Sequence, residues 1–299
     1  MRITETPAAV PLPDAPSAIP ADPWDMLTFP VESWRDSRFE VFSWDRFPEI
    51  IIFDTASFAV QDRFFKRLAF FVEKTGFRGR LAPDAEIAGL HAWNAHDYKA
   101  ADLAVFFDTA RRSGFPLLDE EWEIEAILLK AGILRLDSAS QIIPGSGAVL
   151  SLSREPSHVS LRQRFLAHEG FHGIFFIDED FRNFSRQRWE AFPAFARNFL
   201  LAYFDNQSYD TTNEYLVVNE FMAHLLQMPV SQASWYFGQH LPNSIATRLP
   251  GALPAKEETR DGARFWPELA AVFSVEAEAF SRYVNGRWGL AAGRVWRAR

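Results

Sequence analysis

The sequence predicts an α+β protein that is mostly helical and has a sheet of only a few strands. Long segments without proline carry apolar residues at helical spacing, whereas only short runs, such as residues 49–53, have the character of buried strands. Apolar residues make up 48% and charged residues 23% of the 299 residues, which is typical of a globular protein with a substantial core. No internal repeat is visible, so solenoid and propeller folds are excluded.

In the N-terminal half, an aromatic stretch at 39–43 and the apolar run at 49–53 are the expected strands. Residues 57–75 follow as a helix, because their phenylalanines and leucines gather on one side and Gly76 can end the helix. Residues 76–98 are expected to form a loop. The remaining helices expected in this half cover residues 99–113 and 119–131.

In the C-terminal half, residues 141–154 have the pattern of a hairpin or strand pair interrupted by Pro-Gly. Within it, residues 148–153 alternate between polar and apolar, as expected for an edge strand. The expected helices cover residues 159–176, 178–206, 213–228 and 265–286. Polar or loop-rich connections are expected at 207–212 and 229–264, and the basic tail 287–299 is expected to pack or fray.

Three segments are expected along the chain. Residues 1–34 resemble a flexible leader rich in proline and alanine. Residues 35–138 form an N-terminal α/β portion rich in helix, and residues 139–299 carry the metal-binding pattern described below. No linker separates the last two portions, so a single domain built from both is the alternative.

Charge and composition exclude several classes of function. The net charge of −8 argues against a nucleic-acid partner, because phosphate binding requires a basic surface. No apolar run approaches the ~20 residues of a transmembrane helix. Cysteine is absent, which excludes disulfides, thiolate zinc sites and cysteine nucleophiles. The sequence does not fix the compartment; the leader favours an exported or surface-associated protein over a cytoplasmic one.

The central motif is the pentapeptide His168-Glu169-Gly170-Phe171-His172 within the expected helix 159–176. Residues four apart lie on one face of a helix, so His168 and His172 can bind one zinc ion together. Glu169 lies about 100° further round and can polarise a water at that ion. Both histidines share a stripe with Leu161, Phe165 and Phe175, which predicts that they point inward. Ser157 or Ser160 is the expected helix cap.

The expected helix 213–228 offers a third ligand, Glu220. An acid among Val217, Val218, Phe221, Met222 and Leu225 is costly to bury unless it has a partner, and a zinc ion would provide one. The metal site expected from the residues is therefore His168, His172 and Glu220, with one coordination position left for water. A buried pair with His224 or an arginine, without metal, is the alternative for Glu220.

These two helices resemble those of the zincin metallopeptidases, most closely the gluzincin branch, in which an H-E-x-x-H helix is followed by a later helix with a glutamate ligand. The resemblance implies a zincin-like core, a zinc cofactor, and a peptide or protein substrate whose backbone pairs with a strand at the cleft. Residues 148–153 are the candidate for that strand. Gluzincins often carry an acid four residues after the ligand glutamate, whereas this chain has His224.

A rival third ligand is Asp178, at the position that metzincin-like enzymes use. Those enzymes need glycine at the eighth position to turn the chain sharply, and here that position is Phe175. Glu220 is therefore the preferred ligand.

The expected activity is that of a zinc-dependent hydrolase, most simply a peptidase, with Glu169 as general base. His224, Tyr215 and Tyr209 are candidate donors to the oxyanion, and His96 and His158 are weaker candidates. The segment from His91 to Tyr98, which includes Asp97, is expected to be a structured loop; its alternative is a segment folded against the metal cleft. The alternatives for function are a catalytically inactive zinc-containing interaction module and a non-peptide zinc hydrolase.

Overall fold

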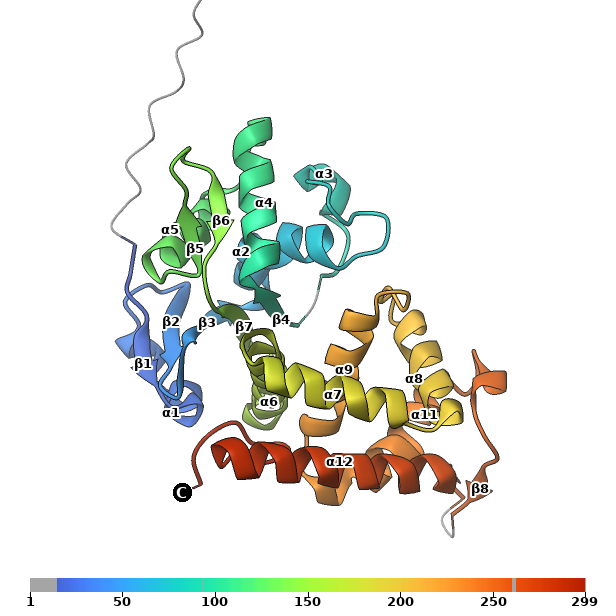
Figure 1. Cartoon of the computed structure of the whole chain (residues 1–299). Helices are drawn as coiled ribbons and strands as arrows, with labels where there is room; N and C mark the ends of the chain where they lie inside the picture. Colours follow the sequence, from blue (N-terminus) through green and yellow to red (C-terminus); the bar gives the residue numbers. More distant parts are fainter. Residues whose placement is uncertain (1–14, 93, 260–261, 299) are drawn as a thin grey trace, which may run out of the picture.

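The computed structural model describes residues 15–92, 94–259 and 262–298, and it confirms an α+β fold that is mostly helical with a small mixed sheet (Figure 1). The strands are β1 (Ile19–Ala21), β2 (Phe39–Trp44), β3 (Phe47–Ser57), β4 (Ala95–Lys99), β5 (Leu134–Leu136), β6 (Ile142–Pro144), β7 (Ala148–Glu155), β8 (Glu257–Glu258) and β9 (Arg264–Phe265). The longer helices are α2 (Phe58–Val72), α4 (Ala100–Ser113), α5 (Asp119–Lys130), α6 (Val159–Ile177), α7 (Glu179–Ala191), α8 (Ala194–Asn206), α9 (Glu214–Leu226) and α12 (Pro267–Trp288). The shorter helices are α1 (Pro23–Thr28), α3 (Asp84–Ile87), α10 (Ala233–Trp235), a π-helical turn at Tyr236–His240, and α11 (Leu241–Ile245).

The main sheet has the strand order β1-β2-β3-β7-β4. Its centre is the parallel pair β3 and β7, and β4 pairs antiparallel with β7 at one edge. At the other edge, β2 is antiparallel to β3 and parallel to β1. Because β3 precedes the expected boundary at residue 138 and β7 follows it, the two expected portions share one sheet.

Both faces of the sheet are covered. Ile50 and Ile52 of β3 belong to a core formed with α6, α9 and α12, whereas Ile51 and Phe53 belong to a second core formed with α2, α4 and α5. Burial on both faces explains why the strand is a continuous apolar run without alternation. Figure 1 shows α2 and α4 above the sheet and α6 below it.

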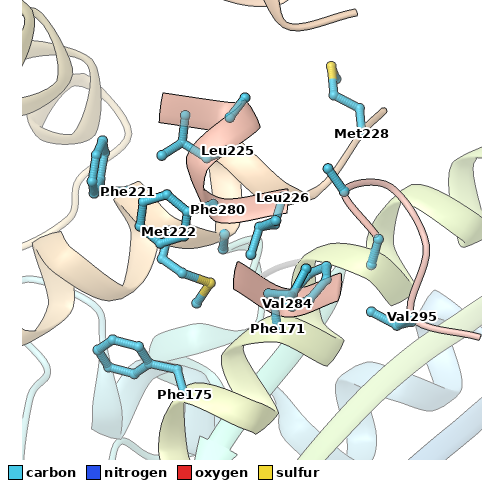
Figure 2. Packing of buried hydrophobic residues seen from close by; sticks show 14 of the residues in the cluster. Phe171, Phe175, Phe221, Met222, Leu225, Leu226, Met228, Phe280, Val284 and Val295 are labelled. Atoms are coloured by element: carbon cyan, nitrogen blue, oxygen red, sulfur yellow. The ribbon is translucent and has the colours of Figure 1, made fainter. Parts of the chain in front are cut away.

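Helix α6 is buried along most of its length between the sheet and the C-terminal helices. Phe171 and Phe175 of α6 pack with Phe221 and Met222 of α9 and with Phe280 of α12 (Figure 2). On the sheet side, a Cβ placed on Gly173 would lie 3.1 Å from Ile50 Cδ1, so the missing side chain permits the close approach of helix and sheet.

The expected edge strand at 148–153 is in fact an interior strand, which is a correction. β7 pairs with β3 on one side and β4 on the other, and its residues from Ala148 to Ser153 are all buried. The expected hairpin at 141–154 does not form either, because β6 pairs with β5. The edge strand next to β7 is β4, and all of it except Lys99 lies in the segment 76–98 expected to be a loop.

Part of the expected leader is folded, which corrects the prediction for residues 15–34. Met26 and Leu27 of α1 are buried, and Asp22 caps that helix by accepting a hydrogen bond from the Trp24 N–H. The same Asp22 accepts a hydrogen bond from the Arg297 N–H, so the C-terminal tail packs against this segment. Residues 1–14 of the expected leader lie outside the described residues.

A buried ion cluster fixes α6 to the sheet. Asp54 of β3 is fully buried and contacts Arg162 of α6 at 2.7 Å and Arg154 of β7 at 2.8 Å. Burial raises the pKa of the Asp54 carboxyl, although both arginines oppose that shift by favouring the ionised form. The cluster therefore holds the start of α6 in register with the two central strands.

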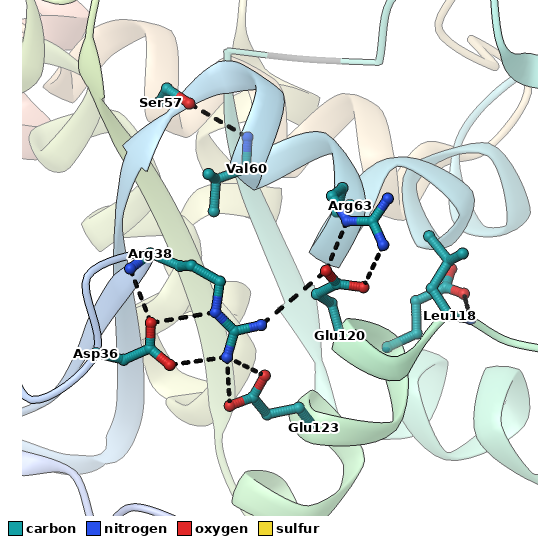
Figure 3. A network of polar contacts seen from close by, with 9 residues as sticks. Asp36, Arg38, Ser57, Val60, Arg63, Leu118, Glu120 and Glu123 are labelled. Atoms are coloured by element: carbon teal, nitrogen blue, oxygen red, sulfur yellow. Dashed lines mark hydrogen bonds and ion pairs between the residues drawn. The ribbon is translucent and has the colours of Figure 1, made fainter.

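A second polar network lies nearer the surface and joins α2 and α5 to the start of β2 (Figure 3). Arg38 contacts Glu123 at 2.9 Å and Asp36 at 2.7 Å, and Arg63 contacts Glu120 at 2.6 Å. Its arginines are substantially exposed, so each pair contributes little to stability.

We expect Asp54→Ala to lower the free energy of unfolding by about 3–5 kcal/mol, because it leaves two arginines without their acid in the interior. Glu123→Ala is the matched control, since it removes one acid from the exposed network and should cost at most about 1 kcal/mol. Urea denaturation measures both. Equal losses for the two variants would contradict the assigned role of the Asp54 cluster.

Candidate metal centre

Helix α6 places the two motif histidines one turn apart on the same face. Their Nε2 atoms are 3.0 Å apart, and the rings meet edge to face with centroids 4.6 Å apart. The helix is capped by His158, whose Nδ1 accepts a hydrogen bond from the Leu161 N–H, and not by either expected serine.

Helix α9 brings Glu220 to the same point. Its two carboxylate oxygens lie 3.7 Å from His168 Nε2 and 3.7 Å from His172 Nε2. Two nitrogens at the usual zinc–nitrogen distance in a tetrahedral site are about 3.3 Å apart, which is close to the separation of the two Nε2 atoms. The donor set of two imidazoles and one carboxylate therefore fits a zinc ion.

Burial shifts the pKa values of these three groups. Burial raises the pKa of Glu220 to about 7, and burial lowers the pKa of His168 well below its usual value. His172 differs: burial lowers its pKa, but the charges of Asp97 and Glu220 outweigh this effect and raise it overall. Glu220 Oε2 and His168 Nδ1 are buried without a hydrogen-bond partner, so the centre is under-satisfied by protein alone.

Glu169 is buried beside the histidines, and its Oε2 also lacks a hydrogen-bond partner. Burial raises its pKa well above the usual range, and the neighbouring carboxylates of Asp97 and Glu220 raise it further. Among the described residues, two groups have ligand atoms close enough to hold one ion: His168 with His172 and Glu220, and Asp97 with Glu169 and His172. The shared His172 joins both groups into one centre.

Asp97 is a site residue that sequence reasoning did not assign. It lies on the edge strand β4, and its Oδ2 is 3.9 Å from His172 Nδ1. The sequence signal that could have identified Asp97 is the polar segment from His91 to Tyr98, for which folding against the metal cleft was the alternative to a structured loop. Successive side chains of a strand point to opposite faces of the sheet. The Asp97 side chain therefore faces α6, whereas those of its neighbours His96 and Tyr98 lie on the other face.

His96 and His158 lie away from the centre. His96 packs on the opposite face of the sheet, where it stacks on Phe65 and bonds through Nδ1 to the Tyr98 hydroxyl at 2.9 Å. His158 is exposed at the start of α6, ten residues or about 15 Å of helix before His168. His91 is exposed.

His224 is oriented toward the centre by two polar neighbours. Its Nδ1 lies 2.8 Å from the Tyr236 hydroxyl and 3.1 Å from Gln227 Nε2, and both groups can donate. Nδ1 then acts as the acceptor, so the proton of the neutral ring is on Nε2, which lies 3.9 Å from Glu220 Oε2. Burial lowers the pKa of His224 to about 3, which keeps this ring neutral.

The two tyrosines expected as candidate oxyanion donors lie at different distances from the centre. A hydrogen bond from Tyr209 lowers the pKa of Glu220, which places the Tyr209 hydroxyl at the third ligand. Tyr215 lies at the rim, where its ring meets Phe175 edge to face and Lys99 Nζ lies 4.4 Å from the ring centroid.

Asp178 has other partners. Its side chain caps α7 by accepting a hydrogen bond of 2.7 Å from the Phe181 N–H, and it contacts Arg287 at 2.9 Å. It belongs to neither of the groups of described residues that could hold an ion.

Two hollows adjoin the centre. Both are lined by Glu73, Asp97 and Glu220; one extends toward Lys99 and Tyr215, and the other toward His168 and His224. The centre therefore lies between two hollows that share three carboxylate residues.

Comparison with models of known protein families, with curated proteins and with solved structures found no match. Among the described residues, no helix combines the length and hydrophobicity required to cross a membrane.

We expect purified protein to bind about one zinc ion per chain. Glu220→Ala and His172→Ala should lose the ion, because each removes a ligand. Asp178→Ala is the matched control and should keep it, because that side chain caps α7 and pairs with Arg287. Elemental analysis of protein never exposed to nickel resin measures this, and loss of zinc in the Asp178 variant would identify the rival ligand.

Zinc affinity should also depend on pH. Glu220 must be ionised to bind the ion, and its pKa in the metal-free protein is about 7. Affinity should therefore be highest above pH 7 and fall as the pH drops through that value, because protons compete for the carboxylate. Competition with a chromophoric chelator across this range measures the effect. If the zinc affinity of Glu220→Gln changes equally steeply with pH, a group other than Glu220 causes the pH dependence.

Proposed function

We propose that the protein is a zinc-dependent peptidase. The observation that supports this most strongly is the convergence of His168, His172 and Glu220 on one point, with the buried carboxylate of Glu169 beside them. Two histidines and one carboxylate leave a coordination position open, as catalytic zinc sites require. The resemblance of these two helices to gluzincins supports the same proposal.

When bound, zinc acts as a Lewis acid that polarises the scissile carbonyl and makes a water acidic. Glu169 accepts a proton from the attacking water as the water oxygen bonds to the carbonyl carbon. The C–N bond then breaks and Glu169 passes the proton to the leaving nitrogen, so one water is consumed per peptide bond. Burial suits Glu169 to this role because it makes the carboxylate a stronger base.

Two groups would stabilise the oxyanion in this mechanism. The His224 ring is neutral and its Nε2–H points toward the centre, so it can donate without a change of charge. The Tyr209 hydroxyl lies at Glu220 and is the second candidate. Tyr215, at the rim, is better placed to contact the substrate than the reacting atoms.

The substrate backbone would pair with β4. This strand ends the sheet beside α6, and its Asp97 reaches the centre. An extended peptide can add to such an edge through main-chain hydrogen bonds. β4 thus takes the role expected for residues 148–153, which are buried in the sheet interior.

One observation favours a second candidate, a zinc-containing interaction module without activity. Burial raises the pKa of Glu169, and the charge of Asp97, which lies close enough to share an ion with Glu169 and His172, raises it further. If Glu169 remains protonated with zinc present, it cannot act as a base. Zinc binding without turnover of peptides or other hydrolysable substrates would support this candidate.

Glu169→Gln separates catalysis from structure, because it keeps the shape of the side chain and removes the base. Zinc content and melting temperature should stay near those of the wild type, while kcat/KM for a peptide substrate found by library screening should fall at least ~100-fold. Glu190→Gln, an exposed glutamate on α7, is the control and should keep full activity. Near-normal turnover by Glu169→Gln would falsify the proposed mechanism.

A further inference from the structure

Two loops that are far apart in the sequence meet beside the metal centre. Thr75 Oγ1, after α2, donates a hydrogen bond of 3.3 Å to the carbonyl oxygen of Ser208, which lies between α8 and α9. Arg78 in the first loop forms an ion pair of 2.6 Å with Asp210 in the second. We call this pair of loops, residues 75–78 and 208–210, the strap.

The strap adjoins the hollows beside the centre. Tyr209 is flanked by the two strap contacts, and its hydroxyl bonds to the ligand Glu220. Glu73, two residues before Thr75, lines both hollows. Both loops therefore reach from their mutual contact down to the residues that surround the ion site.

The hollows open on the two sides of the strap. Arg78 lines the first hollow, and Gln207 and Tyr209 line the second. β4 runs beneath both: Ala95 lines the second hollow, Lys99 lines the first, and Asp97 lines both. A peptide extended along β4 would enter at one hollow, pass the ion site under the strap, and leave at the other.

The second loop has a defined conformation. Ser208 has φ of 68°, a left-handed value that is uncommon outside glycine, and its carbonyl is the one that accepts from Thr75. Asp210 accepts hydrogen bonds from the Thr212 N–H and hydroxyl, which orient its carboxylate. Both residues of the second loop that contact the first loop therefore have a defined orientation.

We propose that the strap makes the cleft a covered passage, and that its substrates are linear, unfolded peptides that enter lengthwise. Closed loops of folded proteins and cyclic peptides would be excluded, because they have no free end to pass beneath the strap. This inference rests on the proposed peptidase function and adds the class of substrate.

The absence of cysteine from the chain allows a direct test. In Thr75→Cys/Ser208→Cys, a short bifunctional thiol reagent with a reducible bond can link only the two introduced residues. The substrates are a linear peptide that the wild type cleaves and the head-to-tail cyclic form of the same sequence. Glu278→Cys/Arg282→Cys, an exposed i, i+4 pair on α12, receives the same reagent as the control.

Linking the strap should change kcat/KM for the linear peptide by less than about threefold, and cleavage of the cyclic peptide should be undetectable. Loss of linear turnover on linking, restored by a reductant, would overturn the inference by showing that the strap must open. Cleavage of the cyclic peptide by the linked protein would overturn it by showing that the cleft is not covered. If the unlinked protein and the wild type cleave no peptide, the proposed function itself fails and the inference falls with it.

Discussion

The close packing of α6 between the sheet and the C-terminal helices is the constraint on which the rest of the structure depends. Gly173 allows the helix to contact Ile50, and the Asp54 cluster fixes its start through Arg162. With these contacts made, the helix cannot rotate without losing its packing on both sides. The direction of His168 and His172 toward α9 therefore follows from the core.

Packing also explains why the centre is poorly satisfied by protein alone. Glu169 and Glu220 are buried with His172 beside the half-buried His168, and several of their polar atoms lack partners. Burial opposes ionisation of both acids and raises their pKa values, and the charge of Asp97 raises both further. Such an arrangement is costly unless a cation is bound, because only a positive charge can offset the repulsion and the lost hydration together. The zinc ion that we propose would supply that positive charge.

Local sequence patterns predicted the helices well, and with them the ligand candidates, because helical spacing alone places His168 over His172 and Glu220 inward on α9. Strand placement was less predictable. β7 alternates like an edge strand yet lies inside the sheet, because its position depends on pairing with β3 and β4, which are distant in sequence. β4 was missed because five residues containing His96 and Asp97 have little strand character, and Asp97 was missed as a site residue with it. Its position is set by β7 and not by local preference.

The residues of the candidate metal centre and those of the strap are held in position by different kinds of contact. The ligands come from α6 and α9, whose side chains are packed in the larger core, so their geometry is as rigid as that core. The two strap loops contact each other through a hydrogen bond and an ion pair near the surface, and such contacts constrain a loop much less than core packing does. Loops held this way can shift to fit different peptides while the ligands stay in place. In the proposed peptidase, the residues that would bind the ion and the loops that would cover the substrate come from different segments of the chain, so substrate entry and catalysis would depend on different contacts.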